Sequence, residues 1–193
     1  NQFIFSNTTI GSIPDSGAGS LARSVTVPAI VSADVNVLLH MTHVFVSSDL
    51  ELRLSAPDVS NVLIVDNNTS NSGGFSNNGY LDTLLDDDNA SAPFINATNS
   101  TLYHYSERYR PTNPLTAFDG SRSSGSWTLT MTDVVSFDTG TFNNFSLVFT
   151  PSGVPNVKID SVTNTDADRD KVEVTYTISN ATASSFDFGV YSS

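Results

Sequence analysis

The residues best placed to do chemistry in this sequence are aspartates, because several of them are clustered. Asp86, Asp87 and Asp88 are consecutive in the segment LLDDDNA. Adjacent carboxylates repel one another, and a hard cation with oxygen ligands, such as calcium, removes that cost. Asp49 (SSDLEL) and Asp119 (AFDGS) stand at predicted strand boundaries, where side chains can point into a loop cluster. The alternative is a solvated acidic loop in which aspartate simply favours turns.

No arrangement typical of an enzyme is present in the sequence. The chain contains no cysteine, which excludes a thiol nucleophile, a zinc–thiolate site and a disulfide. His40 and His43 are three residues apart, so a strand would place them on opposite faces, where they cannot share a metal ion. G-x-S-x-G, phosphate-loop, G-x-G-x-x-G and H-E-x-x-H motifs are all missing. We therefore predict that the chain itself is not catalytic.

Short β-strands must position these residues, because apolar side chains alternate with period two along most of the chain. The predicted strands are 23–28, 34–46, 49–55, 62–65, 126–133 and 145–149. Clusters of Gly, Asn, Asp, Ser and Pro separate them, as is typical of many short antiparallel strands. The pattern predicts an all-β protein, a β-sandwich or jelly roll.

Two segments interrupt this regular spacing. Residues 66–114 form a long polar stretch with few convincing strands, and such a loop is usually functional or held by something other than a core. The segment PSGVP at 151–155 is typical of a linker. Three further strands are predicted after it, at 157–162, 171–179 and 186–192. We predict one domain over residues 1–151 and a linker with a partial β module over 152–193, together forming a piece of a longer protein.

The charge balance excludes several classes of partner. Eight Lys and Arg residues stand against 20 Asp and Glu residues in 193, which gives a formal net charge of −12. A nucleic-acid binder needs a basic surface to displace counterions from phosphate, so nucleic acid is excluded as a partner. Anionic membranes would repel the chain, and it has no apolar run of 18 residues, so membrane insertion is not expected.

Read in order, five separated motifs resemble the P domain, or Homo B domain, of kexin- and furin-like proprotein convertases. The same module follows the catalytic domain of many bacterial secreted subtilisin-like proteases. The motifs are IPDSG (13–17), VNVLLHMTHVFVSSDLELRLSAP (35–57), LLDDDNA (84–90), YRPTNPLTAFDG (109–120) and GSWTLTMTDVVSFDTGTFNNFSLVF (125–149). The chain departs from the family pattern in having VSSDL where a glycine usually precedes the aspartate, and Phe145 where Trp is commoner. The tail weakly resembles a CARDB-type Ig-like module.

The resemblance implies a jelly-roll antiparallel β-sandwich of galactose-binding-like type, followed by a partial Ig-like β segment. It also implies a non-catalytic auxiliary module that stabilises or positions the N-terminal catalytic domain of a secreted serine endopeptidase or another exoenzyme. Bacterial members often bind calcium, and the ligands carried over by motif are Asp49, Asp86, Asp87, Asp88 and Asp119. We expect a secreted or cell-surface location and a monomer.

A second hypothesis is a module that binds carbohydrate or another extracellular or cell-surface polymer, since jelly rolls commonly host sugar sites. Tyr103, Tyr105 and Tyr109 are out of phase with the predicted core and could form its stacking platform. Binding to glycans that is abolished by changing Tyr103 or Tyr105 would favour this hypothesis over the protease module.

Overall fold

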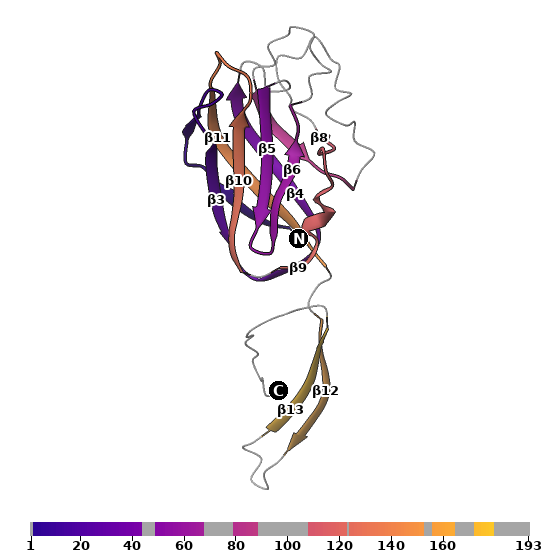
Figure 1. Cartoon of the computed structure of the whole chain (residues 1–193). Helices are drawn as coiled ribbons and strands as arrows, with labels where there is room; N and C mark the ends of the chain where they lie inside the picture. The colour runs from indigo at the N-terminus through magenta and orange to yellow at the C-terminus, as the bar shows by residue number, and fades with distance from the viewer. Residues whose placement is uncertain are drawn as a thin grey trace. The chain divides into compact units, whose positions relative to one another are not determined.

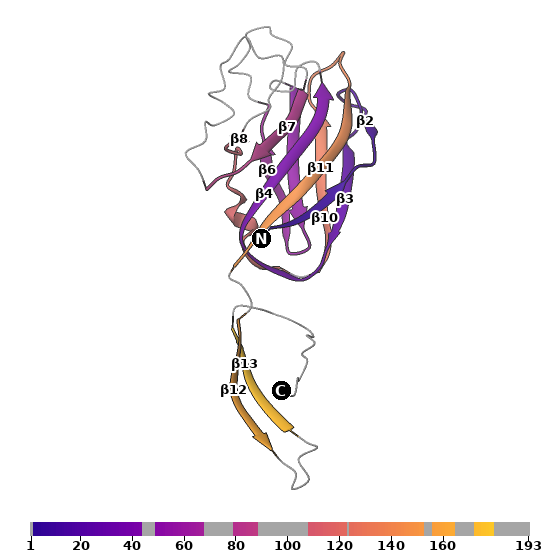
Figure 2. The ribbon, with the colours of Figure 1, turned by 180° about the vertical axis from the view of Figure 1, so that it is seen from behind.

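The computed structural model describes residues 2–43, 49–67, 79–88, 108–122, 124–152, 156–164 and 172–179. It divides the chain into two compact units, Asn1–Pro151 and Ser152–Ser193. The first unit is built from two β-sheets packed face to face (Figures 1 and 2). No helix among these residues has the length and apolar character needed to cross a membrane.

The larger sheet has β4 near its centre, between β11 and β7. In spatial order it contains β1 (Phe3–Asn7), β11 (Gly140–Pro151), β4 (Ile30–His43), β7 (Gly79–Leu85) and β8 (Arg108–Tyr109). Two short strands extend it, β2 (Gly11–Ile13) on β11 and β9 (Gly120–Arg122) on β4. The neighbours are antiparallel except for β7 and β8, which pair in parallel.

The smaller sheet lies in front of the larger one in Figure 1. Its order is β3 (Leu21–Val27), β10 (Gly125–Asp133), β5 (Leu50–Ala56) and β6 (Val59–Val65). All three pairings are antiparallel. The six strands predicted for this unit correspond to β3, β4, β5, β6, β10 and β11, of which β11 begins five residues earlier than predicted, whereas β1, β2, β7, β8 and β9 were not predicted. The prediction of an all-β jelly-roll sandwich is confirmed.

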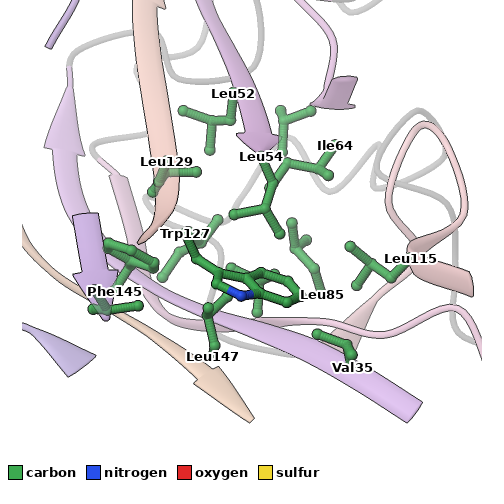
Figure 3. Close-up of a cluster of buried hydrophobic side chains, with 14 of the residues drawn as sticks. Val35, Leu52, Leu54, Ile64, Leu85, Leu115, Trp127, Leu129, Phe145 and Leu147 are labelled. Atoms are coloured by element: carbon green, nitrogen blue, oxygen red, sulfur yellow. The ribbon is translucent and has the colours of Figure 1, made fainter. Parts of the chain in front are cut away.

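The core lies between the two sheets and follows the predicted alternation of side chains (Figure 3). Every second residue of β5 and β10 is buried, including Leu52, Leu54 and Leu129. Trp127 is fully buried, with its ring centroid 5.3 Å from that of Phe118 and 5.2 Å from that of Phe149. Because an alternating strand buries only one of its faces, this pattern also fixes which residues face outward.

β7 lies within the segment 66–114, for which the sequence predicted few strands. Period-two alternation fails there because Asp82 is an extra residue, a β-bulge opposite the Leu39–His40 step of β4. Asp82 has a left-handed backbone with φ of 59°. Because of the bulge, the next buried position after Tyr80 is Thr83, three residues further on, and Leu85 follows two residues later, so the strand is hidden from a periodicity test.

The second unit contains a β-hairpin, β12 (Asn156–Asn164) and β13 (Val172–Ser179). These two strands correspond to the predicted strands 157–162 and 171–179. The third predicted strand, 186–192, lies outside the described residues.

Replacing Trp127 tests how much stability the core centre supplies. We expect Trp127→Ala to lower the free energy of unfolding by about 3–5 kcal/mol through lost burial and a cavity. Trp127→Phe should cost less, because a phenyl ring fills much of the space and removes an indole N–H that has no hydrogen-bond partner among the described residues. Urea unfolding followed by far-UV circular dichroism measures both, and equal losses for the two variants would contradict this account.

Candidate metal centre

Two groups of described acidic residues lie at opposite ends of the sandwich. Asp34 stands near the start of β4 and His43 at its end. Nine residues of strand separate them, which corresponds to about 30 Å at ~3.3 Å per residue. The acids near Asp34 therefore cannot share an ion with those near His43.

Five aspartates meet around the start of β4, and we call them the carboxylate cluster: Asp34, Asp86, Asp87, Asp88 and Asp119. Leu85, the last residue of β7, pairs with Val37 of the antiparallel β4. The residues that follow Leu85 therefore run back alongside Asn36 and Asp34. Carboxylate oxygens of Asp34, Asp87 and Asp88 all lie within 4.8 Å of one another.

Asp119 reaches the cluster because a short 3₁₀ helix, η3 (Leu115–Phe118), ends beside β4. Leu115 and Phe118 are buried and anchor this helix in the core. The Arg122 guanidinium donates hydrogen bonds to the backbone oxygens of Ala117 (2.7 Å), Phe118 (3.0 Å) and Asp119 (2.7 Å). The backbone N–H of Val35 acts on the Asp119 carboxylate and lowers its pKa.

Local hydrogen bonds hold the acidic triplet in place. Asp86 is buried, and its Oδ1 accepts the backbone N–H of Asp88 at 3.0 Å. Its Oδ2 lies 3.4 Å from Nε of Arg108, and its own N–H donates to the carbonyl of Tyr109 at 2.9 Å. Oδ2 of Asp87 accepts the backbone N–H of Thr116 at 3.0 Å, which links the triplet to η3.

The cluster carries uncompensated negative charge. Burial raises the pKa of Asp34 to about 6, and the carboxylates of Asp88, Asp86, Asp119 and Asp87 add to the rise. Burial also raises the pKa of Asp119, with help from Asp87 and Asp88 and against the opposing effect of Arg122 and the Val35 N–H. Within the described part of the chain, no basic side chain forms an ion pair with Asp34, Asp87 or Asp88.

A buried amide oxygen shows that the residues fit a hard cation. Asn36 is 5% exposed, and its Nδ2 donates to Oδ2 of Asp34 at 2.7 Å. Its Oδ1 is buried and has no hydrogen-bond partner among the described residues, an arrangement that costs about 1–3 kcal/mol. A set of carboxylate and amide oxygens suits calcium, whereas zinc sites are built mainly from sulfur and imidazole nitrogen.

The structure brings together four of the five aspartates predicted as ligands and places the fifth, Asp49, elsewhere. Asp49 directly precedes Leu50 of β5, which pairs with Asp133 at the end of β10. Its backbone carbonyl accepts the N–H of Val134 at 2.8 Å. Nε2 of His43, at the far end of β4, lies 3.0 Å from Oδ2 of Asp133. Asp49 therefore belongs to the opposite end of the sheet from the carboxylate cluster.

The two described histidines behave as the sequence predicted for a strand. Nδ1 of His40 lies 2.9 Å from Oδ1 of the bulge residue Asp82, and this pair is partly exposed. The His43 and Asp133 side chains are both 0% exposed, so a substrate in solvent cannot reach them. Tyr103 and Tyr105, predicted for a sugar platform, lie outside the described residues. The prediction was wrong for Tyr109, which is 4% exposed and belongs to the core.

Sequence reasoning missed Asp34 and Asn36. Both alternate with the core residues Val35 and Val37, a position that ordinarily means solvent exposure. The chain that follows β7 covers both residues. The bulge in β7 breaks the alternation by which this strand could have been recognised in the sequence. A polar residue on either side of Val35 was the only signal available.

Comparison with known proteins gives one family and a distant structural likeness. The family model of the proprotein convertase P-domain matches residues 32–149. No curated protein matches. A chain in the crystal structure of the Aeromonas sobria serine protease with the chaperone ORF2 is similar at 14% identity, with a TM-score of 0.48 over 77% of this chain and 26% of that chain. The crystal structure of the serine protease of Aeromonas sobria is similar at 15% identity, with a TM-score of 0.47 over 77% of this chain and 26% of that chain. This chain thus spans about a quarter of the length of both.

The raised pKa of Asp34 predicts a pH dependence of stability when divalent cations are removed. The pKa is about 6 in the folded protein and 3.8 for an unperturbed aspartate, so the folded state binds the proton more tightly. The resulting stability is fully present below about pH 4 and is lost as the pH rises through 6. We expect Asp34→Asn to remove this loss.

Urea unfolding in EDTA between pH 4.5 and 7.5 measures the effect. The free energy of unfolding of wild type should fall relative to that of Asp34→Asn as the pH rises. A difference between the two proteins that stays constant over this range would contradict the prediction.

Proposed function

The chain belongs to the proprotein convertase P-domain family, and on this premise we propose that it is a non-catalytic auxiliary module of a secreted subtilisin- or kexin-like protease or a related exoenzyme. The observation that carries the proposal is the family match, which spans β4 to β11 and so includes the centre of both sheets. The module stabilises or positions a catalytic domain that precedes it, and it works outside the cell or at the cell surface.

The chemistry of the described residues supports an auxiliary rather than a catalytic role. The His43–Asp133 pair has the residue types of a general base and its orienting carboxylate, but both side chains are sealed in the core. The partly exposed His40 pairs with Asp82 on a β-bulge. Nδ1 of His40 faces Oδ1 of Asp82, a carboxylate, whereas an activated nucleophile requires a serine or threonine hydroxyl beside the histidine.

We also propose that the module contains structural calcium bound at the carboxylate cluster. Calcium would neutralise carboxylates that have no basic partner among the described residues, and so remove the repulsion that raises the pKa of Asp34. Extracellular calcium modules work with dissociation constants of about 10⁻⁴–10⁻³ M, which a cluster open to solvent on one side can provide. In a chain without cysteine, an ion of this kind takes the place of a disulfide as a cross-link.

The auxiliary role predicts a dependence of the catalytic domain on this module. The coding sequence upstream should encode a subtilisin-type domain, and deleting residues 1–151 from the full protein should lower the yield of active enzyme and its midpoint of thermal inactivation. Deleting only 152–193 is the matched control and should have a smaller effect, because the sandwich stays intact. An upstream sequence without a protease or other exoenzyme domain, or equal activity and stability after both deletions, would contradict the proposal.

The calcium proposal predicts a shift in the melting temperature of the isolated chain. Calcium at about 100 times its dissociation constant stabilises a protein by about 2.7 kcal/mol, which for a domain of this size raises Tm by about 5–10 °C. Differential scanning calorimetry in EDTA and in excess calcium measures this, and magnesium at the same ionic strength should raise Tm less. An unchanged Tm after exhaustive chelation would remove calcium from the proposal.

A further inference from the structure

We propose that the connection between β10 and β11, residues 134–139, is a binding site for a neutral polysaccharide, with the ring of Phe137 as its stacking platform. We call this segment the β10–β11 loop. Phe137 is 95% exposed, the largest value among the described large hydrophobic residues. An aromatic ring offers a flat apolar face against which the C–H face of a sugar ring can lie. The site is independent of both the proposed auxiliary role and the proposed calcium, neither of which uses this loop.

The backbone of Phe137 separates it from an ordinary exposed side chain. Single exposed apolar residues are common and need no explanation by themselves. Phe137, however, has a φ of 89°, in the left-handed region that favours glycine and is an outlier for a bulky side chain. The chain therefore bears backbone strain at Phe137 without gaining core burial in return. Strain of this kind is found where function requires a fixed geometry.

The start of the loop is fastened to buried groups of the sandwich. The N–H of Val134 donates to the backbone carbonyl of Asp49 at 2.8 Å. The N–H of Val135 donates to Oδ1 of Asp133 at 3.0 Å, while Oδ2 of the same carboxylate lies 3.0 Å from Nε2 of the buried His43. The His43–Asp133 pair therefore positions the loop. A ligand meets a platform that is already ordered, so binding does not have to pay for ordering it.

Two carboxylates stand beside the platform. Oδ1 of Asp15 accepts the N–H of Phe137 at 3.0 Å and that of Ser16 at 2.7 Å. Oδ2 of Asp15 accepts no hydrogen bond within the described part of the chain. Asp138, the next residue after Phe137, is half-buried and forms no ion pair with the described basic residues. Both carboxylates can therefore accept hydrogen bonds from the hydroxyl groups of a sugar that lies on the ring.

The residues around Phe137 favour a hydroxylated ligand over a protein surface. Val135 is 42% exposed, but the other residues that follow or flank the ring along the loop are polar: Ser136, Asp138 and Thr139. Aspartate and serine are depleted at the centre of protein interfaces, where an aromatic anchor is surrounded by further apolar groups. The formal net charge of −12 and the two carboxylates repel acidic polymers. A neutral polysaccharide fits both observations.

The loop lies at the end of the sandwich opposite to the one where the chain enters and leaves it (Figure 1). Phe3 at the start of β1 pairs with Phe149 near the end of β11, whereas Gly140 at the start of β11 directly follows the loop. Nine residues of strand separate Gly140 from Phe149, about 30 Å at ~3.3 Å per residue. The covalent connections to neighbouring domains are therefore at the other end, and so is the carboxylate cluster around Asp34, which pairs with Thr150.

Depletion assays of the whole chain on insoluble cellulose, chitin and starch at physiological ionic strength test the proposal. Wild type should be retained on at least one of the three, and Phe137→Gly should weaken the affinity at least tenfold because the platform is lost. The same variant should unfold at a urea concentration no lower than that of wild type, since glycine adopts the left-handed backbone without strain. A residue that served only the fold would show the opposite, a loss of stability with unchanged retention.

Three further variants separate stacking from other effects. Phe137→Trp keeps an aromatic face and should retain binding, whereas Asp138→Asn removes a charged acceptor and should weaken binding severalfold. Phe3→Ala is the matched control, because it removes a 49% exposed aromatic ring at the other end of the sandwich and should leave the affinity unchanged. Equal retention of wild type and Phe137→Gly, or no retention of wild type on any of the three polysaccharides, would overturn the proposal. A lower stability of the full protein in Phe137→Gly with unchanged retention would also overturn it, and would identify Phe137 as a contact to another domain.

Discussion

Burial of alternate side chains between two antiparallel sheets is the constraint on which the rest of this molecule depends. It sets the register of every strand, because a slip of one residue would carry Leu52, Leu54 and Leu129 out of the core. Strand β4 shows the consequence most clearly. Its inward residues are fixed by packing in the core, so its outward residues are fixed as well, and Asp34 near its start is held about 30 Å from His43 at its end. Each end then gathers its own set of polar groups from distant parts of the chain.

The two ends handle buried charge in opposite ways. At the end of β4, His43 and Asp133 are fully buried, and the histidine and the carboxylate satisfy one another. At the start of β4, the carboxylates of Asp34, Asp87 and Asp88 face one another with no described basic partner, and Arg122 and Arg108 are occupied with η3 and Asp86. At the end of β4, a histidine and a carboxylate are paired with each other. At its start, only oxygen donors come together, which is the composition of a cation-binding site.

This division fits a protein whose family role is to accompany a catalytic domain rather than to react. The groups that resemble catalytic machinery are sealed in the core, where they contribute to the fold. The one described cluster with free ligand capacity contains only oxygen donors, which bind hard cations and do not form covalent intermediates. The proposed calcium would support the sandwich at the end of β7.

The sequence alone determined the fold class, the family and most of the acidic cluster, because these depend on local patterns. Alternating apolar residues specify strands such as β5 and β10, and the consecutive aspartates at 86–88 are neighbours in any fold. It did not reveal β7, since the bulge at Asp82 breaks the alternation, and it grouped Asp49 with acids from which the sheet separates it. Only the tertiary structure brought Asp34 and Asn36 beside Asp87 and Asp88. The physical reason is that an outward-facing residue of a strand becomes part of a site only when another segment covers it, and which segment does so is decided by the pairing of strands far apart in sequence.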